Sequence, residues 1–398
     1  MRSLRTLLAL PLAALVAGAV AVPSARSVES RAPTRGFPNT SHGIHVFEDQ
    51  LTDPLTPGLL RFAATHYDGS QKQRRSMVDA LHGRNPAFVV LQYRLGLGLG
   101  YRASATGCSH DGDWLYVIDG DRWVREWPSK PNERWFFHRG GHREYMCDWG
   151  WYLTNPDSAA WRQWFLPKLR GQVTRTHADG VFLDSVSVPN EFGADAWDPP
   201  LPAVDAAFER AWSRRIERWL PFVRSALDRP VVVNAGSWIT TRDVTDYSGA
   251  SGVMIEGCAQ PSSGGSYAPA DWELQADRVI GLVRIGRIVI CQAYPDPADV
   301  RMRMFVLGTS LLWQGAHTFL NLEIGMDPEW FPEYGIDLGA PVSPLPSTVA
   351  GFRHGGVYVR RFERGRIVVN PTESTHTVTL PATMFRVVPH GGGFVPSS

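Results

Sequence analysis

Short apolar runs that end in a polar residue recur along the chain. Most of them are too short for a helix, contain β-branched or aromatic residues and are bounded by turn residues, which is the pattern of a buried parallel strand. We predict eight strands, at residues 43–48, 59–67, 87–93, 181–184, 231–234, 252–256, 287–294 and 317–323.

Helical patterns separate most of these runs. Apolar residues recur at three- and four-residue steps over 158–177 and 204–227, and further helical segments are expected at 73–81 and 298–313. Pro221 predicts a kink or break in the helix at 204–227. Strands that alternate with helices and end in polar residues predict an α/β fold, a (β/α)8 or TIM barrel over residues 42–340.

The composition changes after the eighth run. A Pro-rich linker at residues 341–346 is followed by three short strand-like runs, at 356–361, 366–370 and 375–380. They predict a small antiparallel β module over residues 350–390, which has too few residues to be stable alone. We expect this module to pack on the barrel.

The segment between residues 100 and 155 is rich in Trp, Tyr, Gly and Asp and has no sustained periodicity. An irregular segment of this length after the third strand indicates a functional loop that forms one wall of the barrel mouth. Asp148 is a candidate substrate-binding residue, for which orientations into and away from the mouth are equally expected. Six rings are candidate sugar platforms, although packing explains each one better by itself: Trp114, Trp123, Trp127, Trp135, Trp149 and Trp151.

Composition and the N-terminus narrow the function. The 398 residues are 43% hydrophobic, enough for one large core, and the 40 basic and 39 acidic residues give no field for nucleic acid. A neutral or weakly charged substrate is therefore expected. Residues 1–25 have the form of an export signal, with Arg2 and Arg5, an apolar segment and a small-residue cleavage site. They predict a secreted protein without stable membrane insertion; an uncleaved anchor is the alternative.

Four cysteines in an exported chain allow three pairings. Cys108 and Cys147 flank the long insertion, while Cys258 and Cys291 end two strands that we place next to each other. We predict the bridges Cys108–Cys147 and Cys258–Cys291, with free buried thiols as the alternative. No CxxC pair is present, so the spacing does not match a zinc site.

The candidate chemistry lies in two carboxylates, Asp184 at the end of the fourth run and Glu256 at the end of the sixth. Neighbouring strands lie about 4.8 Å apart, so these backbones lie on the order of 10 Å apart and inward side chains reduce that separation. Glycoside hydrolysis needs two carboxyl groups about 5 to 9 Å apart, one to protonate the leaving oxygen and one as nucleophile or base. The alternatives are a loop cap for Asp184 and an ion pair with an arginine for Glu256.

Other strand-end residues are candidate substrate ligands, namely Tyr93, Asn234, Gln292 and Tyr294. The chain has no GxSxG and no HExxH motif, so neither a nucleophile elbow nor a zinc protease helix is indicated. We expect no metal and no cofactor. A carbohydrate-binding barrel without catalytic activity is the alternative to an enzyme.

Several of these residues carry a resemblance. The motif DGVFLD at 179–184, the strand ending in Glu256, the helix entry at Asn155-Pro156 and the segment RRFERGRIVVNP at 360–371 resemble the glycoside hydrolase-like barrel families related to the α-galactosidase and endo-α-1,4-polygalactosaminidase barrels. The similarity runs from about residue 42 to residue 380.

The resemblance implies a secreted glycoside hydrolase that cleaves O-glycosidic bonds of a poly- or oligosaccharide. In such barrels an Asp that closes the fourth strand is the nucleophile, which implies that Asp184 is the nucleophile, Glu256 the proton donor and the reaction retaining. Ser185 departs from the pattern, because related barrels often carry Asp or Asn at that position.

Overall fold

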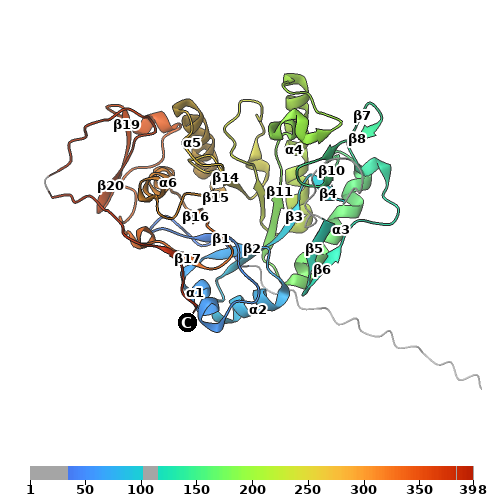
Figure 1. The fold of residues 1–398 in the computed structure, drawn as a ribbon, viewed down its shortest axis with the longest axis horizontal. Coiled ribbons are helices and arrows are strands. Elements are labelled where there is room, and N and C mark those ends of the chain that lie inside the picture. Colours follow the sequence, from blue (N-terminus) through green and yellow to red (C-terminus); the bar gives the residue numbers. More distant parts are fainter. Residues whose placement is uncertain (1–34, 102–114, 382, 398) are drawn as a thin grey trace, which may run out of the picture. The chain divides into compact units, whose positions relative to one another are not determined.

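Eight parallel strands form a ring in the computed structural model, which describes residues 35–101, 115–381 and 383–397 (Figure 1). In ring order, which is also chain order, they are β1 (Phe47–Gln50), β2 (Gly69–Gln71), β3 (Val89–Leu95), β11 (Gly180–Asp184), β13 (Val231–Asn234), β14 (Gly252–Glu256), β15 (Ile288–Ala293) and β16 (Thr318–Leu322). A parallel bridge between Val46 and Leu320 joins the first and last strands. The predicted barrel is therefore confirmed.

Six α-helices are found in the described residues: α1 (Pro57–His66), α2 (Arg75–Arg84), α3 (Ala159–Thr176), α4 (Ala206–Leu227), α5 (Pro269–Arg284) and α6 (Val300–Leu312). Only a short 3-10 turn, Tyr247–Gly249, stands between β13 and β14. Helix α4 continues through Pro221, so the predicted break is absent there. No described helix has both the length and the apolar character needed to cross a bilayer.

The barrel interior is filled by apolar side chains that alternate along the strands. Nine buried residues form one cluster inside the ring: Phe47, Val89, Leu91, Phe182, Val232, Met254, Ile288, Ile290 and Phe319. On β2 the interior position is Gly69, where an added Cβ would lie 2.4 Å from the Phe47 ring. The intervening residues, such as Val181 and Val233, face the helices and belong to the outer core.

The predicted second strand at 59–67 was wrong. This segment is α1, which has Thr56 as its N-cap and Pro57 in its first turn, and the Thr56 hydroxyl accepts from the Leu59 N–H at 3.3 Å. Its buried residues are Leu59, Leu60, Ala63 and Ala64, a helical spacing. The real second strand has only three residues and shows no apolar run.

The predicted irregular insertion instead contains short antiparallel strands. A four-stranded sheet joins β4 (Gly98–Gly100), β9 (Tyr145–Met146), β10 (Trp151–Leu153) and β12 (Trp197–Asp198). Two hairpins accompany it, β5 (Tyr116–Asp119) with β6 (Arg122–Arg125) and β7 (His138–Arg139) with β8 (His142–Arg143). Because β4 follows barrel strand β3 and β12 follows β11, this sheet stands on the carboxyl ends of those strands.

A three-stranded antiparallel sheet near the C-terminus packs on α6 (Figure 1). It contains β18 (Arg353–His354), β19 (Val357–Phe362) and β20 (Gly365–Val369), whereas the predicted strand at 375–380 is not formed. The buried Arg360 guanidinium donates to the carbonyl oxygens of Leu311, Leu312 and Gln314 at the end of α6. The domain boundaries proposed from the sequence stay predictions.

The two aspartates of the DGVFLD motif lie at opposite ends of β11. Asp179 precedes the strand and accepts from the Val90 N–H at 2.9 Å, from His82 at 3.1 Å and from Arg35 at 3.2 Å. These bonds tie β11 to β3 at the amino end of the barrel, where residues support stability. Asp184 ends the strand at the mouth.

The disulfide Cys258–Cys291 is present and joins the sixth and seventh strands, as predicted. Cys147 is disulfide-bonded, but its predicted partner Cys108 lies outside the described residues, as do residues 1–25 and Trp114. The backbone N–H groups of Gly257 and Cys258 both donate to the Gln292 carbonyl oxygen. The bridge thus closes the edge of the mouth immediately beyond Glu256.

We predict that replacing Cys258 and Cys291 together by Ala lowers the free energy of unfolding by about 2–4 kcal/mol, because the bridge closes a long loop. Chemical denaturation followed by circular dichroism would measure the loss. A reducing agent should destabilise the wild type through this bridge and leave a smaller effect in the double variant. Equal stability of the two proteins would contradict the prediction.

Candidate active site

The inward and outward alternation of side chains along the strands continues from the barrel interior to its mouth. Since successive side chains of a strand point to opposite faces, the residue two places after an interior side chain also points inward. Six pairs follow this rule: Leu91 and Tyr93, Phe182 and Asp184, Val232 and Asn234, Met254 and Glu256, Ile290 and Gln292, and Phe319 and Asn321. Five polar residues selected from the sequence therefore meet above one apolar layer.

Asn234 links the two carboxylates. Its Nδ2 donates to Asp184 Oδ1 at 2.8 Å and to Glu256 Oε2 at 2.6 Å. Its Oδ1 accepts from the Gly236 N–H at 2.8 Å, which fixes the orientation of the amide. Because both bonds start from one nitrogen, these two carboxylate oxygens lie at most about 5.4 Å apart, the summed bond lengths.

Asp184 is held on three sides. Besides Asn234, the Tyr93 hydroxyl donates to Oδ2 at 2.6 Å and the Ser185 N–H donates to Oδ1 at 2.7 Å. Ser185 has a φ of 55°, in the left-handed region, so the backbone turns sharply after the carboxylate. Burial and the neighbouring Asp184 charge raise the pKa of Tyr93 well above its usual value, so Tyr93 stays a hydrogen donor.

Glu256 is bonded to neutral groups, so the alternative of an arginine ion pair is wrong within the described residues. The Tyr294 hydroxyl donates to Oε1 at 2.9 Å, and Gln292 Nε2 donates to that hydroxyl at 2.6 Å. Burial and the nearby Asp184 charge raise the pKa of Glu256, while the bonds from Asn234 and Tyr294 oppose the rise. Glu256 therefore keeps its proton to higher pH than an ordinary glutamate.

Three side chains of the mouth were missed in the sequence. Lys72 Nζ lies 2.6 Å from Asp49 Oδ2 and 5.0 Å from the centre of the Tyr93 ring. Glu323, just after β16, accepts from Asn321 at 3.2 Å. Asp49 and Glu323 carry the same signal as Asp184, a carboxylate at the end of an apolar run. Lys72 could not be found because its strand was misplaced.

Three carboxyl groups at this side of the barrel have raised pKa values: Glu323 in the mouth and the buried Glu48 and Glu329. Burial, with neighbouring carboxylates, raises the pKa of Glu323 to about 9 and that of Glu48 well above its ordinary value. Glu329 is 1% exposed, and burial raises its pKa to about 8 although the Ile324 N–H donates to it. Glu323 and Glu329 therefore keep their protons at neutral pH.

Fewer of the described residues of the insertion at 100–155 are exposed candidates for sugar binding than the sequence suggested. Asp148 lies exposed in the turn between β9 and β10, and no hydrogen bond or ion pair joins it to the described mouth residues. Trp135 and Trp151 are buried, and Trp127 packs against Tyr101 and Tyr152. Trp123 and Trp149 are 51% and 45% exposed and keep the prediction of a sugar platform open.

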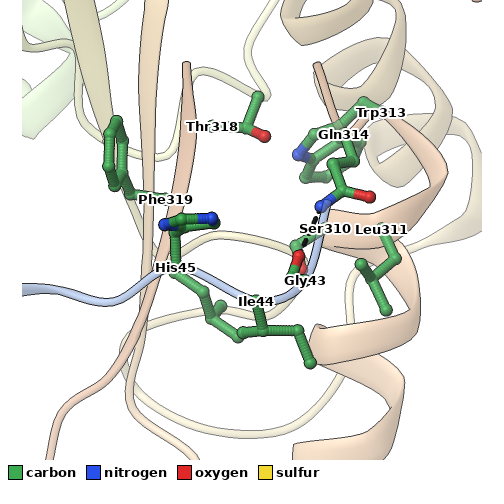
Figure 2. Close-up of a pocket in the computed structure, with 10 residues that line it drawn as sticks. Gly43, Ile44, His45, Ser310, Leu311, Trp313, Gln314, Thr318 and Phe319 are labelled. Atoms are coloured by element: carbon green, nitrogen blue, oxygen red, sulfur yellow. Dashed lines mark hydrogen bonds between the residues drawn. The ribbon is translucent and has the colours of Figure 1, made fainter. Parts of the chain in front are cut away.

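A small cavity lies away from this site. It is formed where the chain enters β1 and β16, with Ile44 and His45 on one side and Gln314 and Thr318 on the other (Figure 2). Gln314 Nε2 donates to the Gly43 carbonyl oxygen across it at 2.5 Å. Its volume of about 20 Å³ holds a water molecule rather than a sugar. No group of metal-ligating side chains is found in the described residues.

One comparison with known proteins identifies a family. A model of hypothetical glycosyl hydrolase family 15 matches residues 82–366, more than half of the chain. The glycoside hydrolase domain of PelA from Pseudomonas aeruginosa is 13% identical with a TM-score of 0.42, over 71% of this chain and 95% of that chain. The PgaB (BpsB) glycoside hydrolase domain from Bordetella bronchiseptica is 11% identical with a TM-score of 0.38, over 70% and 93%. Curated proteins give no match.

We predict that the folded protein loses stability as pH rises from about 5 to about 9. A carboxyl whose folded pKa is raised binds more protons when folded, so each such group lowers the free energy of unfolding by up to about 1.4 kcal/mol per pH unit between its unfolded and folded pKa values. Thermal melting between pH 5 and 9 would show the slope. Glu329→Gln should flatten it between pH 5 and 8, whereas Glu373→Gln, at an exposed position, should not. A slope that Glu329→Gln leaves unchanged would contradict this assignment.

Proposed function

The chain belongs to hypothetical glycosyl hydrolase family 15 and is a glycoside hydrolase, and we propose that Asp184 and Glu256 cleave the O-glycosidic bonds of a poly- or oligosaccharide with retention of configuration. One observation carries this proposal: a single amide, that of Asn234, donates to both carboxylates at the barrel mouth. It supports a pair that acts on one bond.

The spacing supports retention. Retaining glycosidases place their two carboxyl groups about 5–5.5 Å apart, whereas inverting enzymes leave about 6.5–9.5 Å for a water molecule. The limit of about 5.4 Å between the bonded oxygens of Asp184 and Glu256 agrees with the shorter spacing.

The environments of the two groups support their roles. The raised pKa of Glu256 suits the acid that protonates the leaving oxygen. Asp184, which accepts three donors, would attack the anomeric carbon and form a covalent glycosyl ester. Glu256, now ionised, would then take a proton from water as that water attacks the ester, which frees Asp184 and restores the acid.

The remaining mouth residues would position this pair and border the sugar. Tyr93 and Tyr294 each donate to one carboxylate, and Gln292 orients Tyr294. We keep these three, with Asn234, as substrate-binding candidates, and Asp148 as a candidate on the outer wall. The export signal predicted at residues 1–25 supports action outside the cytoplasm.

We predict that Asp184→Asn lowers turnover by about 10³-fold or more, because it removes the nucleophile at nearly constant shape. The matched control is Asp179→Asn, at the other end of the same strand. It should lower the thermal midpoint, because it weakens the bonds to His82 and Arg35, and leave kcat close to wild type. Hydrolysis of polysaccharides or activated aryl glycosides would be measured beside melting curves.

Glu256→Gln adds a second arm to this experiment. It should spare activated aryl glycosides relative to polysaccharides, because protonation matters less for a good leaving group. Near-normal turnover by Asp184→Asn would refute the assignment of Asp184 as the nucleophile. A wild type that binds sugars but hydrolyses none would favour the catalytically silent barrel.

We predict that Tyr294→Phe moves the basic limb of the pH profile of kcat/KM to higher pH, by up to about one unit. The Tyr294 hydroxyl lowers the pKa of Glu256 by donating to it, so its removal raises that pKa and the acid keeps its proton longer. Tyr116→Phe, at a surface tyrosine of β5, serves as the control. A basic limb that moves to lower pH would count against Glu256 as the acid.

A further inference from the structure

The ends of β16, β1 and β2 bring together a second group of polar side chains, Asp49, Lys72 and Glu323, which we call the recognition group. In a ring of eight strands β1 stands opposite β13, so this group faces Asn234 and the two carboxylates across the mouth. We propose that the recognition group binds the hydroxyl groups of a neutral pyranose ring whose glycosidic bond lies at Asp184 and Glu256. The identity of this ligand rests on the proposed function.

The backbone departs from regular strand geometry at both Asp49 and Lys72. The register between β1 and β2 shifts between Glu48 and Gln50, so that Asp49 is the extra residue of a bulge. Bulges re-aim a side chain and occur beside active sites. Lys72, immediately after β2, has a φ of 62°, which is unfavourable for a residue with a side chain. The ends of β1 and β2 are therefore both irregular, and the Lys72 ammonium and the Asp49 carboxylate are in contact there.

Tyr93 connects the recognition group to the nucleophile. The Lys72 ammonium lies over the face of its ring, and its hydroxyl donates to Asp184 at 2.6 Å. One aromatic side chain therefore separates the cation from the reacting carboxylate. Glu323 lies next to the end of β15, because its backbone N–H donates to the Ala293 carbonyl oxygen at 3.0 Å, and its side chain accepts from Asn321 of β16 at 3.2 Å. A sugar ring bound at Asp184 would meet these groups on its other side.

The donors and acceptors of the group suit hydroxyls. An ammonium has three N–H donors, of which Asp49 takes one, and the Asp49 carboxylate also accepts from Gln71. The Glu323 carboxyl is protonated at neutral pH and can donate as well as accept. Adjacent ring hydroxyls need this mixture, since each hydroxyl both donates and accepts.

The charges of the recognition group favour a neutral sugar over an acidic one. The Lys72 and Asp49 charges cancel, and Glu323 is neutral near pH 7, so the recognition group has no net charge there. A uronic acid would gain Lys72 but meet Asp49 and, across the mouth, Asp184. We therefore expect a neutral hexose to bind more tightly than the corresponding uronic acid.

A neighbouring ion pair provides the matched control. Arg74 Nε lies 2.6 Å from Asp53 Oδ2, and this pair joins the same two strand-end segments as Lys72 and Asp49. Arg74 is the N-cap of α2, and its guanidinium also donates to the Asp53 carbonyl oxygen at 3.4 Å. If the Lys72 pair acted only as a brace between these segments, Arg74→Met and Lys72→Met would have similar effects.

The test combines binding and kinetics. Calorimetric titration and saturation-transfer NMR would measure binding of D-galactose, D-glucose, D-galacturonic acid and D-glucuronic acid to the Asp184→Asn protein, alone and with Lys72→Met or Arg74→Met. In the active chain, KM and kcat would be measured on activated aryl glycosides. Melting curves would establish that each variant is folded, and Asp49→Asn, which preserves volume, would replace Lys72→Met should that variant not fold.

We expect a neutral hexose to bind and Lys72→Met to weaken it at least about tenfold, with a larger change in KM than in kcat, whereas Arg74→Met should change binding less than twofold. Four results would each overturn the proposal. They are unchanged binding in Lys72→Met, an equal loss of binding in Arg74→Met, tighter binding of a uronic acid than of the hexose, and no binding of any hexose. Hydrolysis that survives Asp184→Asn would refute the proposed nucleophile without touching the binding result. Loss of hydrolysis in Asp184→Asn with unchanged binding in Lys72→Met would refute the recognition group alone.

Discussion

The two-residue alternation of strands around a filled barrel is the constraint on which the site depends. Phe182, Val232 and Met254 occupy the interior of three neighbouring strands, so the next inward positions can only lie above them, at the mouth. These positions are Asp184, Asn234 and Glu256. Their convergence needs no special loop conformation, because the packed layer beneath fixes both the height and the direction of each side chain.

The surroundings of Asp184 and Glu256 also differ, although both are carboxyl groups at strand ends. Asn234 donates to both carboxylates, so it does not by itself distinguish them. The difference lies in the surroundings: Asp184 accepts a backbone N–H and the Tyr93 hydroxyl, while the pKa of Glu256 is raised by burial and by the Asp184 charge. Under the proposed function, Glu256 with its raised pKa is therefore the better candidate for the proton donor.

The sequence was sufficient wherever a strand was long enough to show its pattern. Strands three to eight were predicted from apolar runs, and the fourth, fifth and sixth end at Asp184, Asn234 and Glu256 as expected. The Cys258–Cys291 bridge was predicted from the placement of the sixth and seventh strands and is present. The second strand has three residues, and the apolar run before it belongs to α1, so Lys72 was missed. The hydrogen bonds of Asn234 and Tyr93 depend on side-chain contacts between strands, which a linear pattern does not contain.

The two halves of the mouth are held by different means. Glu256 ends a regular strand, and beyond it the disulfide and the two N–H groups bonded to the Gln292 carbonyl fix the edge between β14 and β15. Asp49 and Lys72 instead rely on a bulge and a left-handed residue, stabilised by each other's charge and by Tyr93. Regular strands fix the distance between the proposed catalytic carboxyls, whereas the irregular ends of β1 and β2 would, under the proposal for Asp49 and Lys72, determine which sugar hydroxyls are bound. Under the proposed function, a change of sugar specificity would require changes at the ends of β1 and β2 and leave the Asp184–Asn234–Glu256 network intact.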